Sequence, residues 1–206
     1  MSEDKFNIML SGVGGQGLML LSETMGRACS KMDKEVITGE QHGLSQRSGS
    51  IYVHLRIGED AHSPLIPYGE ADLMVSLEGM EALRNIEYLK PDGHIISSDR
   101  LMHHPIETNK VVEEEVEEYI TIEDIVEKLE DVTENIYMID SLSLAKEAGN
   151  PRTENVVLLG AVATIPDFPL EKEVLKEVVK ETVPEKTIDV NLKAFELGYE
   201  EASKNR

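Results

Sequence analysis

Short apolar runs alternate with amphipathic stretches through the first half of the chain. Apolar runs bounded by glycine or polar residues are typical of strands that are covered on both faces. They predict strands at Phe6–Leu10, at Glu35–Thr38, in "ADLMVSL" and in "GHIISSD". From Gln16 to about Lys31, apolar residues recur at helical spacing, which predicts the first helix. The helical-looking "GMEALRNIEYL" and the turn "KPDG", in which glycine is expected to take the positive φ, separate the last two of these strands.

The stretch "GSIYVHLRIG" has a two-residue period instead. Its apolar residues are Ile51, Val53, Leu55 and Ile57, and the residues between them are Tyr52, His54 and Arg56. Alternation of this kind predicts a half-buried strand.

The second half of the chain is mainly helical in pattern. The predicted elements are a helix over Ile122–Leu129, a strand in "IYMID", a helix from a Ser141 cap to a stop at Gly149, a helix that starts at Thr153–Asn155, and helices in "EKEVLKEVVKETV" and "IDVNLKAFELGYEEASKN". Asn155 is a candidate for binding the free amides at its helix start. The helix that follows it is apolar nearly all round, which predicts burial at the centre of the fold or against a second subunit.

This alternation of strands and helices predicts one α/β domain over residues 1–206, with a Rossmann-like, mostly parallel sheet and helices on both of its faces. Ligands and partners of such sheets meet the carboxyl ends of the strands. The expected fold therefore brings the glycine-rich "GVGGQG", the polar "TGEQHGLSQRSGS" and the segment after "VSLEG" to one rim.

The glycine-rich segment lies between the first strand and the first helix, where backbone amides can cradle a phosphate. It contains Gly12, Gly14, Gly15, Gln16 and Gly17, and its glycine spacing is that of a dinucleotide fingerprint. Glu40 stands near the position of the acidic residue that binds a ribose hydroxyl in such folds. The segment lacks the lysine and hydroxyl residue of a P-loop. Two interpretations stay open: a free-standing nucleotide-binding protein that uses Gly12–Gly17 and Glu40, or a tight turn that packs strand on helix.

A second polar cluster lies directly before the alternating strand. It contains His42, Ser45, Gln46 and Arg47. Loops with this donor capacity are typical of recognition surfaces, so these residues are candidates for a subunit interface. Three roles for Arg47 stay open: organising the loop through backbone carbonyls, binding a phosphate or carboxylate, or contacting another subunit.

Charge and composition narrow the function classes. The chain carries 40 acidic and 20 basic residues, a formal net charge of -20, which disfavours nucleic acid and anionic membranes as partners. One cysteine, Cys29, cannot supply the four thiolates of an iron–sulfur cluster, and the six histidines show no metal-site spacing. The amino terminus lacks a signal-peptide pattern and no apolar run approaches the roughly 20 residues of a membrane span, so a cytoplasmic protein is expected.

Several segments together resemble a known family. "GVGGQG" after the first strand, "EQHGLSQRSGS" before the third, "LEGMEALR" and "GNPRTENVVLLGA" are similar, in this order, to the gamma-type subunit of 2-oxoacid:ferredoxin oxidoreductases. The resemblance covers nearly the whole chain and is nearest to the small subunit of the archaeal indolepyruvate enzymes. The chain departs from the family pattern "QRGG" at Ser48, a change that bears on close approach to the backbone.

The resemblance implies an enzyme subunit without a catalytic centre of its own. Enzymes of this family oxidatively decarboxylate a 2-oxoacid to an acyl-coenzyme A and pass the electrons to ferredoxin. Thiamine diphosphate, its magnesium ion and the iron–sulfur clusters are expected in the larger partner subunit. The single cysteine and the missing acidic diphosphate–magnesium motif of this chain agree with that division. Coenzyme A is expected as a co-substrate.

By the same resemblance, the rim loops are expected to pack on the larger subunit. The candidate interface residues are His42, Ser45, Gln46, Arg47 and Asn155. The candidates for contacting coenzyme A or the diphosphate are Gly12, Gly14, Gly15, Gln16, Gly17 and Arg47. No catalytic or metal-binding residue is expected in this chain.

Overall fold

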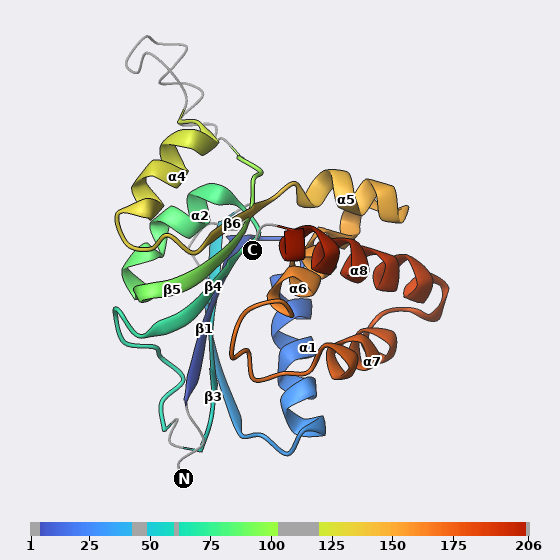
Figure 1. Cartoon of the computed structure of the whole chain (residues 1–206). Coiled ribbons are helices and arrows are strands. Elements are labelled where there is room, and N and C mark those ends of the chain that lie inside the picture. Colours follow the sequence, from blue (N-terminus) through green and yellow to red (C-terminus); the bar gives the residue numbers. More distant parts are fainter. Residues whose placement is uncertain (1–4, 43–48, 60–61, 103–119, 205–206) are drawn as a thin grey trace.

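A computed structural model of the chain describes residues 5–42, 49–59, 62–102 and 120–204. The described residues form a six-stranded sheet between two layers of helices (Figure 1). The strands are β1 (Phe6–Val13), β2 (Val36–His42), β3 (Ser50–Ile57), β4 (Ala71–Ser76), β5 (Leu89–Ser98) and β6 (Ile136–Ile139), in the order β2-β3-β1-β4-β5-β6. The predicted α/β class is confirmed.

Most neighbouring strands of the sheet are parallel. β1 pairs with β4, β4 with β5 and β5 with β6 in parallel, whereas β3 runs antiparallel to both β1 and β2. The mostly parallel sheet predicted from the sequence is therefore confirmed. Because β3 separates β1 from β2, the second strand along the chain does not lie beside the first, as it would in a dinucleotide-binding fold.

Helices cover both faces of the sheet, which confirms that prediction (Figure 1). One face carries α1 (Leu18–Lys31), α5 (Ser141–Ala148), α6 (Glu154–Val162), α7 (Lys172–Thr182) and α8 (Ile188–Lys204), and the other carries α2 (Gly79–Arg84) and α4 (Ile122–Glu130). Short 3-10 turns lie at Ile86–Tyr88, Pro151–Thr153 and Glu185–Thr187. None of the described helices is both long and apolar enough to cross a membrane.

α6 is enclosed by other elements of the same chain. All of its residues after Glu154 are buried, between α8, α5, α1 and the sheet. The apolar pattern of α6 predicted burial, and within the described residues α6 is buried at the centre of this fold. α8 approaches it closely at a glycine, because a Cβ at Gly160 would lie 1.9 Å from the Phe195 carbonyl oxygen.

The prediction of a half-buried strand is wrong for two polar residues of β3, because both are buried. His54 and Arg56 are only 1% and 7% exposed, because the segment 62–70 supplies their partners. Arg56 Nη1 donates a hydrogen bond to the Ser63 carbonyl oxygen at 2.8 Å, and Ile66 N donates one to His54 Nδ1 at 3.2 Å. Alternation shows which side chains are polar, but it does not show that a later segment covers them.

Two local predictions also need correction. Asp92, not Gly93, takes the positive φ of the "KPDG" turn, at 62°, since aspartate tolerates the left-handed region. α5 is capped by Asp140, whose Oδ1 accepts a hydrogen bond from Ser143 N at 3.0 Å. Ser141, the predicted cap, is instead the first residue inside this helix.

Candidate functional site

The ends of three strands meet at one edge of the sheet. Val13 at the end of β1 pairs with Ser50 at the start of β3, and β2 ends at His42 on the same edge. Gly14 N donates a hydrogen bond to the Gly49 carbonyl oxygen at 3.1 Å, which joins the glycine-rich loop to the residue before β3. Within the described ranges, the predicted rim of glycine-rich loop and polar segment is confirmed.

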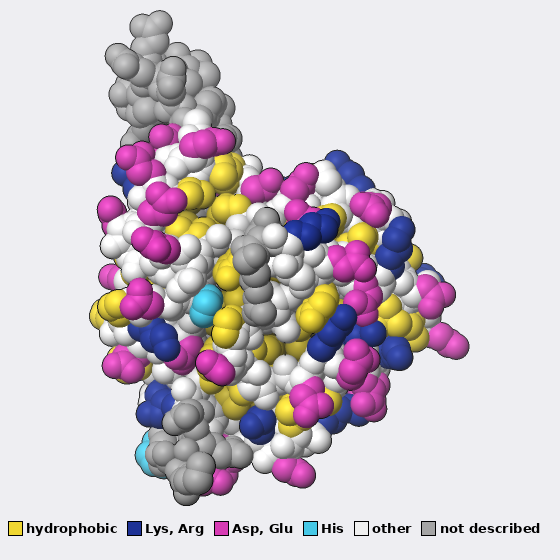
Figure 2. Space-filling model, in the orientation of Figure 1, with side chains coloured by type: hydrophobic (Ala, Val, Ile, Leu, Met, Phe, Trp, Pro, Cys, Tyr) yellow, Lys and Arg dark blue, Asp and Glu magenta, His cyan; other side chains and the backbone are white. Residues whose placement is uncertain are grey.

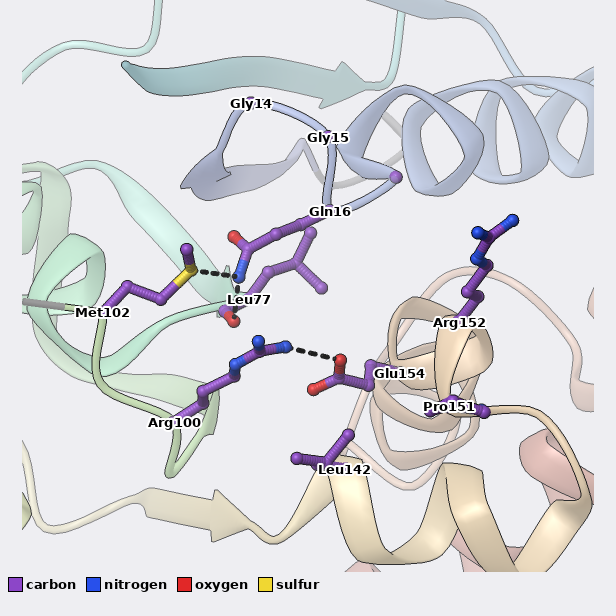
Figure 3. A pocket seen from close by; sticks show the side chains of 11 residues that line it. Gly14, Gly15, Gln16, Leu77, Arg100, Met102, Leu142, Pro151, Arg152 and Glu154 are labelled. Atoms are coloured by element: carbon purple, nitrogen blue, oxygen red, sulfur yellow. Dashed lines mark hydrogen bonds and ion pairs between the residues drawn. The ribbon is translucent and has the colours of Figure 1, made fainter. Parts of the chain in front are cut away.

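Gln16 folds its side chain back onto the glycine-rich loop (Figure 3). Its Oε1 accepts a hydrogen bond from Val13 N at 2.7 Å, while its Nε2 donates one to the Leu77 carbonyl oxygen at 3.1 Å and lies 3.7 Å from Met102 Sδ. One side-chain amide therefore connects the end of β1, the end of β4 and the segment after β5. These contacts give Gln16 a role in shaping the loop, and its contact with a cofactor stays a prediction.

Two of the four glycines in this loop are favoured by their backbone conformation, and a third is closely packed. Gly15 and Gly17 have positive φ values of 96° and 84°, which side-chain-bearing residues rarely adopt. A Cβ at Gly12 would lie 3.0 Å from a neighbouring side-chain oxygen. A Cβ at Gly14, by contrast, would make only ordinary contacts, the nearest at 3.6 Å. Packing within the described residues therefore does not explain the glycine at position 14.

A cavity of about 650 Å³ opens beside this loop (Figure 3). The loop and the start of α1 form one wall, the segments after β4 and β5 form a second, and the starts of α5 and α6 form a third. The lining residues are Gly14, Gly15, Gln16, Gly17, Leu77, Arg100, Met102, Leu142, Pro151, Arg152 and Glu154. The first amides of a helix have no acceptor inside the helix, so the wall at which α1 begins attracts negative charge.

Among the described lining residues, two arginines and one glutamate are charged. Arg100 Nη1 and Glu154 Oε1 form an ion pair at 2.8 Å. Arg152 extends towards the side of the cavity at which α1 begins (Figure 3), and no carboxylate among the described residues pairs with it. An excess of positive charge at the cavity contrasts with the formal net charge of -20 and with the many acidic side chains on the face in Figure 2.

Glu78 holds the wall that contains Arg100 and Met102. Its carboxylate accepts hydrogen bonds from Met102 N at 2.9 Å and from Glu81 N at 3.0 Å. The Arg100 carbonyl oxygen accepts one from Gly79 N at 2.9 Å. Burial raises the pKa of the Glu78 carboxyl group, although the two backbone amides oppose this shift. A buried acceptor thus positions the segment after β5 opposite the glycine-rich loop.

Seven lining residues were not predicted from the sequence as site residues: Leu77, Arg100, Met102, Leu142, Pro151, Arg152 and Glu154. Arg152 and Glu154 lie in the quoted motif "GNPRTENVVLLGA", where two charged residues directly before an apolar helix were a usable signal. Nothing in the local sequence around Arg100 and Met102 indicates a site. They reach the cavity because they follow β5. This strand runs parallel to β4, which runs parallel to β1, so all three strands end at the same rim.

The candidate interface residues are described only in part. Ser45, Gln46 and Arg47 lie outside the described residues, and for His42 the backbone alone is described. Asn155 is buried, and its Oδ1 accepts a hydrogen bond from Val156 N at 2.9 Å, which confirms its predicted role at the start of the helix. Its Nδ2 donates a hydrogen bond to the Gly17 carbonyl oxygen at 3.1 Å. Contact of these residues with a partner subunit stays a prediction.

Glu40 is not placed as the acidic residue of a dinucleotide-binding fold is. It pairs with Val53 of β3, the strand that lies between β2 and β1. Two strand spacings, roughly 9–10 Å, therefore separate the backbone of β2 from that of β1. The position of Glu40 expected under the nucleotide-binding alternative, at the end of a strand beside β1, is therefore wrong.

Cys29 does not fit the ligation of an iron–sulfur cluster. It is the one cysteine of the chain and is fully buried in the core. Burial raises the pKa of its thiol to about 11, which disfavours the thiolate that would bind iron. In the part of the chain that the structure describes, no group of three or more histidine, cysteine or acidic side chains could hold a metal ion.

Comparison with known proteins matches residues 7–201 to the family "Pyruvate ferredoxin/flavodoxin oxidoreductase". The chain is 41% identical to the indolepyruvate oxidoreductase subunit IorB of Thermococcus kodakarensis, over 96% of both chains. It is 40% identical to the subunit of the same name from Pyrococcus horikoshii, also over 96% of both. The 2-oxoglutarate synthase subunit KorC of Methanocaldococcus jannaschii is 27% identical, over 95% of this chain and 92% of that one.

Solved structures share the fold. The gamma subunit of a keto/oxoacid ferredoxin oxidoreductase from Geobacter sulfurreducens matches with a TM-score of 0.72 at 24% identity, covering 97% of this chain and 99% of that one. The 2-oxoglutarate:ferredoxin oxidoreductase of Magnetococcus marinus matches with a TM-score of 0.73 at 21% identity, covering 98% of this chain and 32% of that longer one. With the full-length sequence matches, these findings do not favour a free-standing nucleotide-binding protein. The chain belongs to the pyruvate ferredoxin/flavodoxin oxidoreductase family, as a subunit of an oxidoreductase.

Proposed function

We propose that this chain is the small subunit of an indolepyruvate:ferredoxin oxidoreductase. Such an enzyme oxidatively decarboxylates an aryl 2-oxoacid to an acyl-coenzyme A, with ferredoxin as the electron acceptor. The observation that carries the proposal is the 41% identity to an indolepyruvate oxidoreductase subunit over 96% of both chains. Identity to the 2-oxoglutarate synthase subunits is lower, between 23% and 27%, which favours indolepyruvate over 2-oxoglutarate as the substrate.

In this proposal the catalytic centre belongs to a larger partner subunit. The chain has one cysteine, whose buried thiol does not suit cluster ligation, so the iron–sulfur clusters are assigned to that partner. Thiamine diphosphate and its magnesium ion are assigned to the partner as well, and ferredoxin exchanges electrons with the complex there. The complex is proposed to work in the cytoplasm.

The cavity beside the glycine-rich loop is the proposed contact with a cofactor. Its helix-start wall and the guanidinium of Arg152 suit a phosphate group, and coenzyme A and thiamine diphosphate both carry linked phosphates. The structure of the Magnetococcus marinus enzyme was determined with coenzyme A bound, which supports coenzyme A as the ligand. The residues proposed to form or border this contact are Gly12, Gly14, Gly15, Gln16, Gly17 and Arg47.

Native mass spectrometry of the complex, purified anaerobically from its own cells, tests the assembly. We expect this chain to be bound to a larger subunit that contains iron–sulfur clusters and thiamine diphosphate. The complex should reduce ferredoxin faster with indolepyruvate than with pyruvate or 2-oxoglutarate, and the isolated chain should show no turnover. A lone chain or homo-oligomer, or activity of the isolated chain, would overturn the proposal.

The Arg47→Ala variant of the assembled complex tests the cofactor contact separately. If Arg47 binds a phosphate of coenzyme A, the KM for coenzyme A should rise while the KM for the 2-oxoacid stays unchanged. Arg27→Ala is the matched control, because Arg27 lies on the surface of α1 in an ion pair with Glu23 at 2.7 Å. Unchanged kinetics in both variants would contradict a cofactor contact at Arg47 and leave the loop a structural role.

A further inference from the structure

Glu154 is a carboxylate in the cavity, and the other charged side chains among the described lining residues are arginines. Its Oε1 pairs with Arg100 Nη1 at 2.8 Å, and only 17% of its side chain is exposed. Arg152, two residues earlier, has no carboxylate partner among the described residues. The cavity therefore presents one arginine that is available to a ligand and one that an internal acid already holds.

Glu154 keeps other stabilising contacts when Arg100 moves away. Its Oε2 accepts a hydrogen bond from Ser141 Oγ at 3.2 Å, and Ser141 Oγ lies 2.8 Å from Ser98 Oγ. Glu154 is also the first residue of α6, where the helix dipole stabilises negative charge. Loss of the ion pair would therefore not leave its carboxylate buried without a partner, which is the arrangement that costs most.

The Arg100 side chain can change its partner without movement of its backbone. The backbone is held on both sides, since its carbonyl oxygen accepts a hydrogen bond from Gly79 N at 2.9 Å and its amide donates one to Ser98 Oγ at 3.3 Å. The side chain itself is 38% exposed. A ligand in the cavity can thus compete with Glu154 for this guanidinium.

On the basis of the proposed function, which places a phosphate-bearing cofactor in this cavity, we propose that Arg100 makes the cavity selective for linked phosphates and that Glu154, by competing for Arg100, lowers the affinity for them. A first phosphate binds at the start of α1 and at Arg152, where no carboxylate of the described residues competes. A second phosphate takes Arg100 from Glu154, because two of its oxygens can accept the planar guanidinium, whereas Glu154 binds Arg100 through Oε1 and its Oε2 accepts a hydrogen bond from Ser141. A ligand with a single phosphate gains only the first of these contacts.

Calorimetric titration of the full chain at low salt, with inorganic pyrophosphate and with inorganic phosphate, tests this inference. The wild-type chain should bind pyrophosphate more tightly than phosphate. Glu154→Gln keeps the acceptor for Ser141 but removes the competing charge, so it should raise the pyrophosphate affinity about fivefold and the phosphate affinity less than about twofold. Arg100→Gln should abolish the preference, so that both anions bind alike.

Glu130→Gln is the matched control, because it removes the same charge from an exposed position of α4, on the opposite face of the sheet. The inference is overturned if the wild-type chain binds neither anion, or if Glu154→Gln fails to raise the pyrophosphate affinity. It is also overturned if Glu154→Gln and Glu130→Gln raise both affinities equally, which would be an effect of net charge. If Glu154→Gln does not fold, Arg100→Gln decides, because a preference for pyrophosphate that persists in it contradicts the inference. None of these outcomes affects assembly with the larger subunit, so failure here is distinguishable from failure of the proposed function.

Discussion

Asn155 and Gly17 lie 138 positions apart and are joined by a hydrogen bond of 3.1 Å from Asn155 Nδ2 to the Gly17 carbonyl oxygen. The same oxygen accepts bonds from Leu20 N and Leu21 N in the first turn of α1. It therefore connects the starts of α1 and α6, two of the helices that begin at the cavity. The shape of the glycine-rich loop thus depends on a residue far away in the sequence.

Substitution of Asn155 should weaken this link by an amount that depends on the chemistry of the replacement. Asn155→Ala removes the hydrogen bonds to the Gly17 carbonyl and from Val156 N, while the Gly17 carbonyl keeps its helical donors, so we expect a loss of about 1–2 kcal/mol in the free energy of unfolding. Asn155→Asp places a carboxylate oxygen against that carbonyl, so a larger loss of about 2–3 kcal/mol is expected. Urea unfolding followed by circular dichroism measures both values. Equal stability of the two variants would contradict the described orientation of the amide.

Gly17, which forms this contact, and Gly26, further along α1, should respond oppositely to alanine. At Gly17 the φ value is 84° and a Cβ would lie 2.5 Å from Asn155 Nδ2, so Gly17→Ala should lower the free energy of unfolding by about 2–3 kcal/mol. Gly26 lies inside α1, where a Cβ would have no neighbouring atom within 4 Å, so Gly26→Ala should raise it by up to about 1 kcal/mol. Thermal unfolding of both variants gives the comparison, and a loss at Gly26 would show that α1 is packed there.

Substitution of Gly14 distinguishes a packing role of the glycine from a role in ligand binding. A Cβ there would meet its nearest neighbour at 3.6 Å, so Gly14→Ala should change the free energy of unfolding by less than about 0.5 kcal/mol. If the loop approaches a phosphate closely, the same variant should still bind pyrophosphate more weakly than the wild-type chain does. Denaturant unfolding and calorimetry on one preparation measure both effects. A stability loss as large as that of Gly17→Ala would mean that packing alone requires this glycine.

Much of the fold could be predicted because the local spacing of apolar residues indicates which segments are strands and which are helices. The apolar run Phe6–Leu10 and the helical pattern from Gln16 correspond to β1 and α1 to within a few residues. The second strand was predicted to end at Thr38, yet β2 continues to His42. Gly39–His42 has little intrinsic strand preference, and its pairing with β3 holds it extended.

Only one wall of the cavity, the glycine-rich loop, was predicted from the sequence. The glycine-rich loop has a sequence signature, because its conformation requires glycine at particular positions. Arg100 has no such signature, since it becomes a neighbour of Glu154 only through the strand order and through the packing of α6. Long-range pairing of this kind is not encoded in the spacing of either residue.

The burial of His54 makes the stability of the fold depend on pH. Its Nδ1 accepts a hydrogen bond from Ile66 N, and burial, followed by the positive charge of Arg56, lowers its pKa from the ordinary value of 6.5. The unfolded chain therefore binds the proton more readily than the folded one. The contribution of His54 to stability is complete above pH 6.5 and is lost as the pH falls towards its lower folded-state pKa.

His54→Asn isolates this contribution from those of buried carboxyl groups. Glu78 and Asp99 have raised pKa values, so they act in the opposite direction at acidic pH, and the total pH profile of the wild-type chain mixes both effects. An asparagine oxygen can accept the bond from Ile66 N in place of Nδ1 but does not titrate. The difference in free energy of unfolding between wild type and His54→Asn should therefore stay constant above about pH 7 and shrink as the pH falls below about 6.5. Urea unfolding of both chains between about pH 5 and 8 measures this difference. A constant difference over the whole range would mean that His54 has the same pKa in the folded and unfolded states, contrary to its position beneath the segment 62–70.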